Sequence, residues 1–212
     1  MILRKNSPTR LKNKQVPRQV LLAIALAGSG CAALFGWDIH APGILSEKFV
    51  HDVAPLQQRI ALYLDPSASN YISQNRGSRT ADPQTYHVGE SFAPMLVEAF
   101  QKGFGEFIFL EVEPNPDVMK QYGIPYLAAV RVKEFSNRVT WKGQALALVT
   151  ETTVLDPSLQ LVARFESEGV SDSQKVFAKK GGPEVNLNAA LENNAAAIVH
   201  YLQDSLGRGE WR

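Results

Sequence analysis

A single apolar run near the N-terminus divides this chain into a short leading segment and a body that must fold by its own packing. The run, VLLAIALAGSGCAALFGW, spans residues 20–37 and contains Cys31, the only cysteine among the 212 residues. With one cysteine, the body cannot hold an internal disulfide, and the usual cysteine-based zinc patterns are excluded. Its stability must therefore come from a packed core.

The order of parts around this run is that of a secretory signal. Six basic residues come first, no acidic residue appears before Asp38, and small residues from Ala27 to Gly30 stand directly before Cys31. Because a basic head stays on the cytoplasmic side, the body is expected across the membrane.

The end of this segment, LAGSGC, resembles the lipobox of bacterial lipoproteins. The resemblance implies cleavage before Cys31 and acylation of its sulfur and its new amine. Ala32 in the next position implies sorting to the outer membrane, where the protein would lie on the periplasmic face. Two alternatives stay open from the residues alone: an uncleaved signal anchor in the inner membrane, and simple cleavage after Ala27.

Composition limits what the rest of the chain does. It is 45% hydrophobic and 20% charged, which suits one domain with a core. Removing the leading segment takes six of the 22 basic residues and none of the 21 acidic ones, so the body carries a net charge of about −5. This charge argues against nucleic-acid binding, which rests on Lys and Arg that neutralise phosphates.

Four segments follow from these patterns. We predict a lipoprotein-type signal peptide at 1–30, a tether and short N-terminal segment at 31–57, an α/β envelope domain at 58–207, and a C-terminal tail at 208–212.

Hydrophobic periodicity predicts seven elements in the body. Asn186 is expected to cap the last helix, and Gly103 and Gly105 to end the first. The order β-α-β-β-β-β-α predicts an α+β fold, a single sandwich domain with a mixed sheet and both helices on one face. The predicted strands are 59–64, 107–112, 126–135, 145–156 and 159–170, and the predicted helices are 89–102 and 187–206.

This element order behind a lipoprotein-like signal resembles a group of bacterial envelope lipoproteins. The group includes the curli-export pore subunit and the Pel-exopolysaccharide-export ring protein. The resemblance covers residues 59–206 and rests on the order of elements and on the strand YLAAVRVKEF. It implies a mainly non-catalytic protein that assembles into rings or contacts secretion machinery.

Several residues were weighed as sites of chemistry, and none is predicted to be catalytic, cofactor-binding or metal-binding. The four histidines lie far apart in sequence and read as surface residues. Glu111 and Glu113 read as a solvated strand face, and Ser91 lacks the context of a hydrolase nucleophile.

The long polar connection from Asp65 to His87 is the strongest candidate for a functional surface, because few connections are of this length. It holds residue types enriched in binding surfaces, and we predict a partner contact there. The four residues are Tyr71, Arg76, Arg79 and Tyr86.

The sequence thus favours a membrane-anchored extracytoplasmic lipoprotein. Its expected role is that of a structural or accessory component of an envelope export, secretion or assembly system. Its expected partners are the membrane, through a lipid on Cys31, and an envelope protein or further copies of itself. The alternatives are an extracytoplasmic enzyme with its site under residues 65–87, and a signal-anchored inner-membrane protein with the same domain.

Overall fold

The computed structural model describes residues 36–75, 83–140, 143–171 and 182–211. Its folded body begins at Trp37. Within the described residues, no helix is both long and apolar enough to cross a membrane.

A five-stranded mixed sheet in the order β5-β2-β6-β7-β8 forms the centre of the body. Strand β2 (Leu56–Leu64) lies between β5 (Phe104–Leu110) and β6 (Leu127–Thr140) and pairs in parallel with both. From β6 the sheet continues antiparallel through β7 (Gly143–Leu155) and β8 (Leu161–Val170). The predicted mixed sheet is therefore confirmed, with parallel pairs on either side of β2 and an antiparallel meander from β6 to β8.

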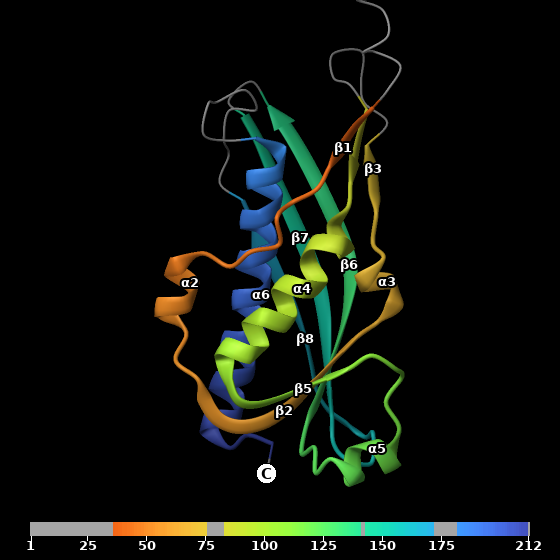
Figure 1. The fold of residues 1–212 in the computed structure, drawn as a ribbon, viewed down its shortest axis with the longest axis vertical. Coiled ribbons are helices and arrows are strands. Elements are labelled where there is room, and N and C mark those ends of the chain that lie inside the picture. Colours follow the sequence, from red (N-terminus) through yellow and green to blue (C-terminus); the bar gives the residue numbers. More distant parts are fainter. Residues whose placement is uncertain (1–35, 76–82, 141–142, 172–181, 212) are drawn as a thin grey trace, which may run out of the picture. The chain divides into compact units, whose positions relative to one another are not determined.

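Two long helices cover one face of this sheet, as Figure 1 shows. They are α4 (Val88–Gly103) and α6 (Pro183–Arg208). Alternate residues of β7 turn toward them, among them Leu146, Leu148 and Val154, which are fully buried. This period of two is what packs one face of a strand into a core.

The opposite face carries a smaller core at one end of the sheet. The short helix α5 (Pro116–Gln121) packs there through Met119. In β2, Ala61 belongs to this second core while its neighbours Ile60 and Leu62 belong to the main one. The chain thus crosses from β2 to β5 over one face and returns to β6 over the other. The prediction of helices on one face holds for α4 and α6 but not for α5.

A second, three-stranded sheet is built from short segments in the order β1-β4-β3. These strands are β1 (Trp37–Ile39), β3 (Ser73–Asn75) and β4 (Gln84–Tyr86). Together with the four-residue helix α3 (Pro66–Ser69), β3 and β4 lie in the segment that the sequence suggested was one long connection. That segment is therefore structured at both of its described ends.

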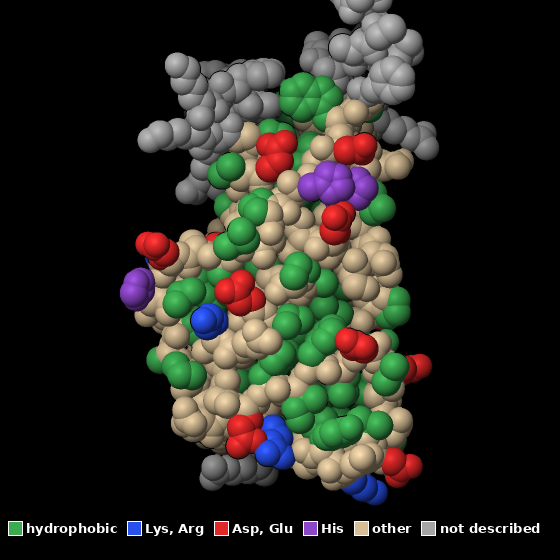
Figure 2. All heavy atoms as spheres, in the orientation of Figure 1, with side chains coloured by type: hydrophobic (Ala, Val, Ile, Leu, Met, Phe, Trp, Pro, Cys, Tyr) green, Lys and Arg blue, Asp and Glu red, His purple; other side chains and the backbone are tan. Residues whose placement is uncertain are grey.

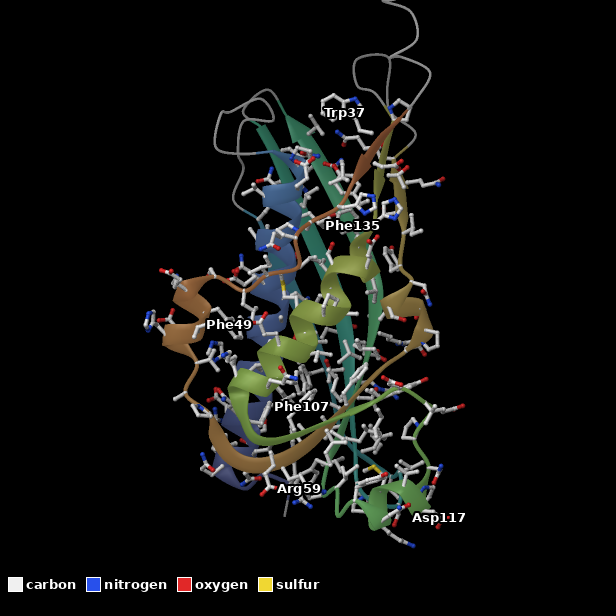
Figure 3. The ribbon with its side chains drawn as sticks, viewed as in Figure 1. Trp37, Phe49, Arg59, Phe107, Asp117 and Phe135 are labelled. Atoms are coloured by element: carbon white, nitrogen blue, oxygen red, sulfur yellow. The ribbon has the colours of Figure 1, made fainter. Side chains whose placement is uncertain are left out.

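Residues 37–57, which belong to the predicted tether and short N-terminal segment, pack on the body. Ile39, Leu45, Phe49 and Val53 are buried in the main core. In Figure 3, Phe49 points from α2 (Glu47–Asp52) toward α6.

Side-chain hydrogen bonds hold this N-terminal segment against α6. The Asn188 amide donates to the Ile44 carbonyl at 2.9 Å, and its oxygen accepts from the Ile44 N–H at 3.2 Å. The Glu192 carboxylate accepts from the backbone N–H of Ser46 at 3.0 Å.

The C-terminal residues also belong to the body. Gly209 ends α6 in the left-handed conformation at φ 68°, a position that glycine adopts without steric cost. The Tyr126 hydroxyl donates to the Trp211 carbonyl at 2.7 Å, and the two aromatic rings pack edge to face. Residues 208–211, in the predicted C-terminal tail, therefore contact the body.

Three local predictions, for Asn186, Gly103 and Gly105, were wrong; Gly105 lies within β5. Asn186 does not cap α6, whose N-cap is Gly182; it is buried, and its side chain donates to the Gln144 carbonyl. Gly103 does not turn the chain after α4, because Phe104 follows in extended conformation. A Cβ on Gly103 would lie 2.6 Å from the Val199 side chain, so this glycine lets α4 and α6 approach closely.

Candidate functional site

The candidate site surrounds α3, at the carboxyl ends of the parallel strands β2 and β5. Crevices outside the carboxyl ends of such strands are the usual binding places in α/β sheets, where neighbouring connections leave on opposite faces. Two hollows flank α3 and share Ser69 and Asn70 in their linings. The first, of about 340 Å³, is lined by Ser69, Asn70, Tyr71, Ile72, His87 and Glu90. The second, of about 310 Å³, is lined in addition by Tyr63, Phe109 and Glu111.

Local hydrogen bonds build α3 directly after the strand. The Asp65 carboxylate accepts from the Ser67 N–H at 2.8 Å, and Pro66 occupies the first turn, where its missing N–H is not needed. The hydrogen bonds from Ser67 hold the pKa of Asp65 below its usual range, and the Arg131 charge adds to this effect. The Asp-Pro pair that stops β2 thus also starts α3.

Contact with α4 fixes the segment that follows α3. The Gly89 N–H donates to the Tyr71 carbonyl at 2.9 Å. A Cβ on Gly89 would lie 2.4 Å from the Ser69 carbonyl oxygen, so only glycine allows the two backbones to come this close. Tyr71 packs partly on the main core, while the Ile72 side chain beside it is 53% exposed.

A histidine and carboxylate cluster lies on the far side of the first hollow. The imidazoles of His40 and His87 stack with their centroids 4.0 Å apart and their planes 13° from parallel. The Glu90 Oε2 atom lies 3.1 Å from the Nδ1 of His40 and 3.8 Å from the Nδ1 of His87. On its other side, His87 Nε2 lies 3.6 Å from Asp38 Oδ1. Figure 2 shows histidine side chains side by side on this face, with acidic side chains next to them.

Two segments far apart in sequence bring this cluster together. Asp38 is in β1 and His40 follows it, while His87 is the N-cap residue of α4 and Glu90 lies in its first turn. Parallel pairing of β1 with β4 sets the two segments side by side. Among the described residues, this is the one group of three His, Cys, Asp or Glu side chains placed to hold a metal ion, with its ligand atoms within 4.8 Å of one another.

The structure describes two of the four predicted contact residues, Tyr71 and Tyr86. Tyr71 lines the first hollow. The prediction that Tyr86 contacts a partner is wrong, because its side chain is fully buried. Arg76, Arg79 and also Cys31 lie outside the described residues.

Tyr86 instead joins the small sheet to the large one. Its hydroxyl donates to Gln84 and accepts from the amides of Asn137 and Gln144, and its ring packs on Phe135. Burial raises the pKa of Tyr86 to about 12, although the Gln144 hydrogen bond opposes this shift. The protonated Tyr86 hydroxyl therefore has a structural role, which is to link the two sheets through hydrogen bonds.

The remaining residues considered for catalysis, Ser91, Glu111 and Glu113, are not arranged as a catalytic site. Ser91 is buried, and its hydroxyl donates to the Ala41 carbonyl at 2.8 Å. Because β5 ends at Leu110, Glu111 and Glu113 lie beyond the strand that was expected to align them.

Sequence reasoning missed the pairing of His40 with His87. One local signal was present: Glu90 follows His87 by three residues, which places both side chains on one face of a helix start. His40 lies 47 residues before His87, and only the pairing of β1 with β4 reveals that they meet.

Comparison with known proteins gives structural neighbours but no sequence relative. No protein-family model and no curated protein sequence matches the chain. Similar solved structures include the PelC dodecamer from Paraburkholderia phytofirmans, at 10% identity over 69% of this chain and 91% of that chain, with a TM-score of 0.40. Lipoprotein GNA1162 from Neisseria meningitidis is 6% identical over 71% of this chain and 99% of that chain, with a TM-score of 0.34. The hypothetical protein CT253 from Chlamydia trachomatis is 7% identical over 73% of this chain and 96% of that chain, with a TM-score of 0.38.

A PelC protein and a lipoprotein are thus among the similar structures.

Proposed function

We propose that this chain is a lipid-anchored protein of the bacterial envelope that binds another component of an export, secretion or assembly system. The observation that carries the proposal is the order of parts before the body: a basic head, a short apolar stretch and AGSGC ending at Cys31. In this proposal Cys31 becomes the first residue of the mature chain and carries the lipid. More than one acyl chain then gives stable anchoring, at about 0.8 kcal/mol per buried methylene.

The short distance along the chain between Cys31 and the body supports this role. Six residue steps separate Cys31 from Trp37, and an extended chain of that length spans at most about 22 Å. A lipid on Cys31 would therefore keep the body next to the membrane surface. Trp37 itself is 45% exposed, and tryptophan is a residue type that favours the membrane interface.

Replacing Cys31 with serine is expected to abolish lipid attachment. The measurement is incorporation of a labelled fatty acid in a bacterial host that processes lipoproteins, followed by the intact mass of the purified protein. Ser29→Ala keeps a small residue before the cysteine and should retain the label. Label that persists in Cys31→Ser, or is absent from the wild type, would contradict the proposal. An uncleaved, unlabelled chain would identify the signal anchor instead.

The surface around α3 is the proposed contact for the partner protein. Ile72 and Phe109 are exposed apolar side chains on opposite sides of α3. Figure 2 shows apolar side chains gathered over α4 and toward this region. Tyr71 supplies an aromatic side chain at the edge of a hollow, the kind of residue and place at which binding energy concentrates. The partner that fits is a protein with an apolar projection.

Ile72→Asp is expected to release the partner without unfolding the body, because Ile72 is largely exposed and a buried carboxylate would disfavour the contact. Val185→Asp is the matched control: Val185 is 46% exposed at the start of α6. The measurement compares proteins that co-purify with each full-length variant from detergent-solubilised envelopes, together with oligomer mass and melting temperature. A folded Ile72→Asp protein that keeps every partner and its oligomer mass would overturn this assignment.

A further inference from the structure

We propose that His40, His87 and Glu90 form a binding site for a divalent transition-metal ion of the Zn²⁺ class, with Asp38 as a positioning residue. Three side chains supply the ligand atoms, two imidazole nitrogens and one carboxylate oxygen. Asp38 acts through His87. This combination of ligands suits ions such as Zn²⁺ and does not suit Mg²⁺ or Ca²⁺, which prefer all-oxygen sites.

The separations of the ligand atoms fit such an ion. Zn–N and Zn–O bonds of about 2.0–2.1 Å place neighbouring ligands of a tetrahedral ion about 3.3 Å apart. The observed separations from Glu90 Oε2 are 3.1 Å to His40 Nδ1 and 3.8 Å to His87 Nδ1. Both Nδ1 atoms lie beside the same carboxylate oxygen, and the three ligand atoms are within 4.8 Å of one another. Because the two rings stack 13° from parallel and each nitrogen lone pair lies in its ring plane, at least one imidazole must turn out of the stack when both bind one ion.

The surroundings of His87 add an independent feature of metal sites. A histidine that binds a metal through one ring nitrogen usually donates the other N–H to a carboxylate, which fixes the tautomer and the ring. His87 Nδ1 lies 3.8 Å from Glu90 Oε2, and its Nε2 lies 3.6 Å from the Asp38 carboxylate, an ion-pair distance that a small movement of Asp38 would shorten to a hydrogen bond. The neighbouring hollow of about 340 Å³ gives room for water to complete the coordination.

A bound ion would join two parts of the chain. His40 follows β1, the first strand of the body, while His87 and Glu90 belong to the start of α4. β1 has three residues and pairs only with β4 in the described sheet. Cross-linking β1 to α4 would therefore stabilise the part of the body that lies closest in sequence to the proposed lipid.

The test is titration of untagged, detergent-solubilised full-length protein with Zn²⁺ after treatment with a chelator. We expect one equivalent to bind and the melting temperature to rise, because a ligand that binds only the folded state stabilises it. Mg²⁺ at the same concentration should do neither. His40→Ala and Glu90→Gln should each abolish the single equivalent, and Asp38→Asn should weaken it by about tenfold or more.

Two matched controls separate the site from general histidine binding. His51 and His200 are exposed histidines outside the cluster, so His51→Ala and His200→Ala should bind Zn²⁺ as the wild type does. In the unmodified protein, the imidazole NMR signals of His40 and His87 should shift with Zn²⁺ while those of His51 and His200 stay in place. An absence of stoichiometric binding would overturn the proposal, as would binding that survives His40→Ala and Glu90→Gln or histidine shifts at the control positions.

Discussion

Replacing Gly169 with alanine is expected to destabilise the body by about 3 kcal/mol, at the upper end of the cost of overpacking. Gly169 lies in β8 on the face that turns toward α6. A Cβ there would lie 2.1 Å from the Ala190 carbonyl oxygen and 2.3 Å from the Asn194 backbone nitrogen. Because both neighbours are backbone atoms of a helix, no side-chain rotation relieves the clash, and α6 must move away from the sheet.

That movement would also break the hydrogen bonds of Asn194. Its buried side-chain amide donates to the carbonyls of Leu148 at 3.1 Å and Ser167 at 2.8 Å, and its oxygen accepts from the Thr150 hydroxyl at 3.0 Å. Buried polar groups left without partners cost about 1–3 kcal/mol each. Gly169→Ala would therefore disrupt both the packing and the hydrogen bonds between α6 and the sheet.

The measurement is thermal or chemical unfolding of the full-length protein, where a loss of 3 kcal/mol corresponds to about 6–12 °C in melting temperature. Gly207→Ala is the matched control. It is the same substitution in α6 with nothing within 4 Å of the new methyl, and it should stabilise the helix by about 0.4–1 kcal/mol. Equal melting temperatures for the two variants would show that α6 does not approach β8 as described.

The long elements of this fold are predictable from the sequence because periodicity marks them. The alternation through β7 and the three-or-four spacing of leucines in α6 both survive in the structure as buried faces. Their ends are less predictable. β6 extends to Thr140, five residues past its predicted end, because it stays paired with β7 as far as Gly143.

The short elements escape prediction because tertiary contacts, not local pattern, create them. β1, β3 and β4 have three residues each, too few for any period to show. β4 exists because β1 and β3 pair with it on either side. The polar composition that suggested a long open connection instead reflects short strands of a small sheet, whose middle strand β4 holds the buried Tyr86.

The candidate site also contains one feature that local sequence indicates and one that only tertiary contacts create. Tyr71 was predicted from residue type alone, because an aromatic residue in a polar stretch is a signal for a binding surface, and it lines the first hollow. The histidine cluster was not found, since its members are assembled by parallel pairing of two segments that are distant in sequence. Local chemistry is visible in the sequence, whereas a site shared between β1 and α4 requires the fold.

Truncating Leu191 to alanine is the second change with a large expected effect, a loss of about 2–5 kcal/mol in the free energy of unfolding. Leu191 lies in α6 and is fully buried, as are three other apolar side chains that form a stripe with it along the same helix face. These members are Leu187, Ile198 and Leu202. The loss combines the transfer free energy of the deleted carbons with the cavity that α4, α6 and the sheet leave when they cannot close around it.

Val185→Ala provides the comparison, because it also removes side-chain carbons from α6 but at a position that is 46% exposed. Its effect should stay within about 0.5 kcal/mol. Unfolding of both full-length variants in denaturant should give equal slopes and separated midpoints, since the two proteins expose nearly the same surface. If Leu191→Ala unfolded with the wild type, the apolar stripe of α6 would have to face a partner instead of the sheet. The surface around α3 would then no longer be the leading candidate for the protein contact.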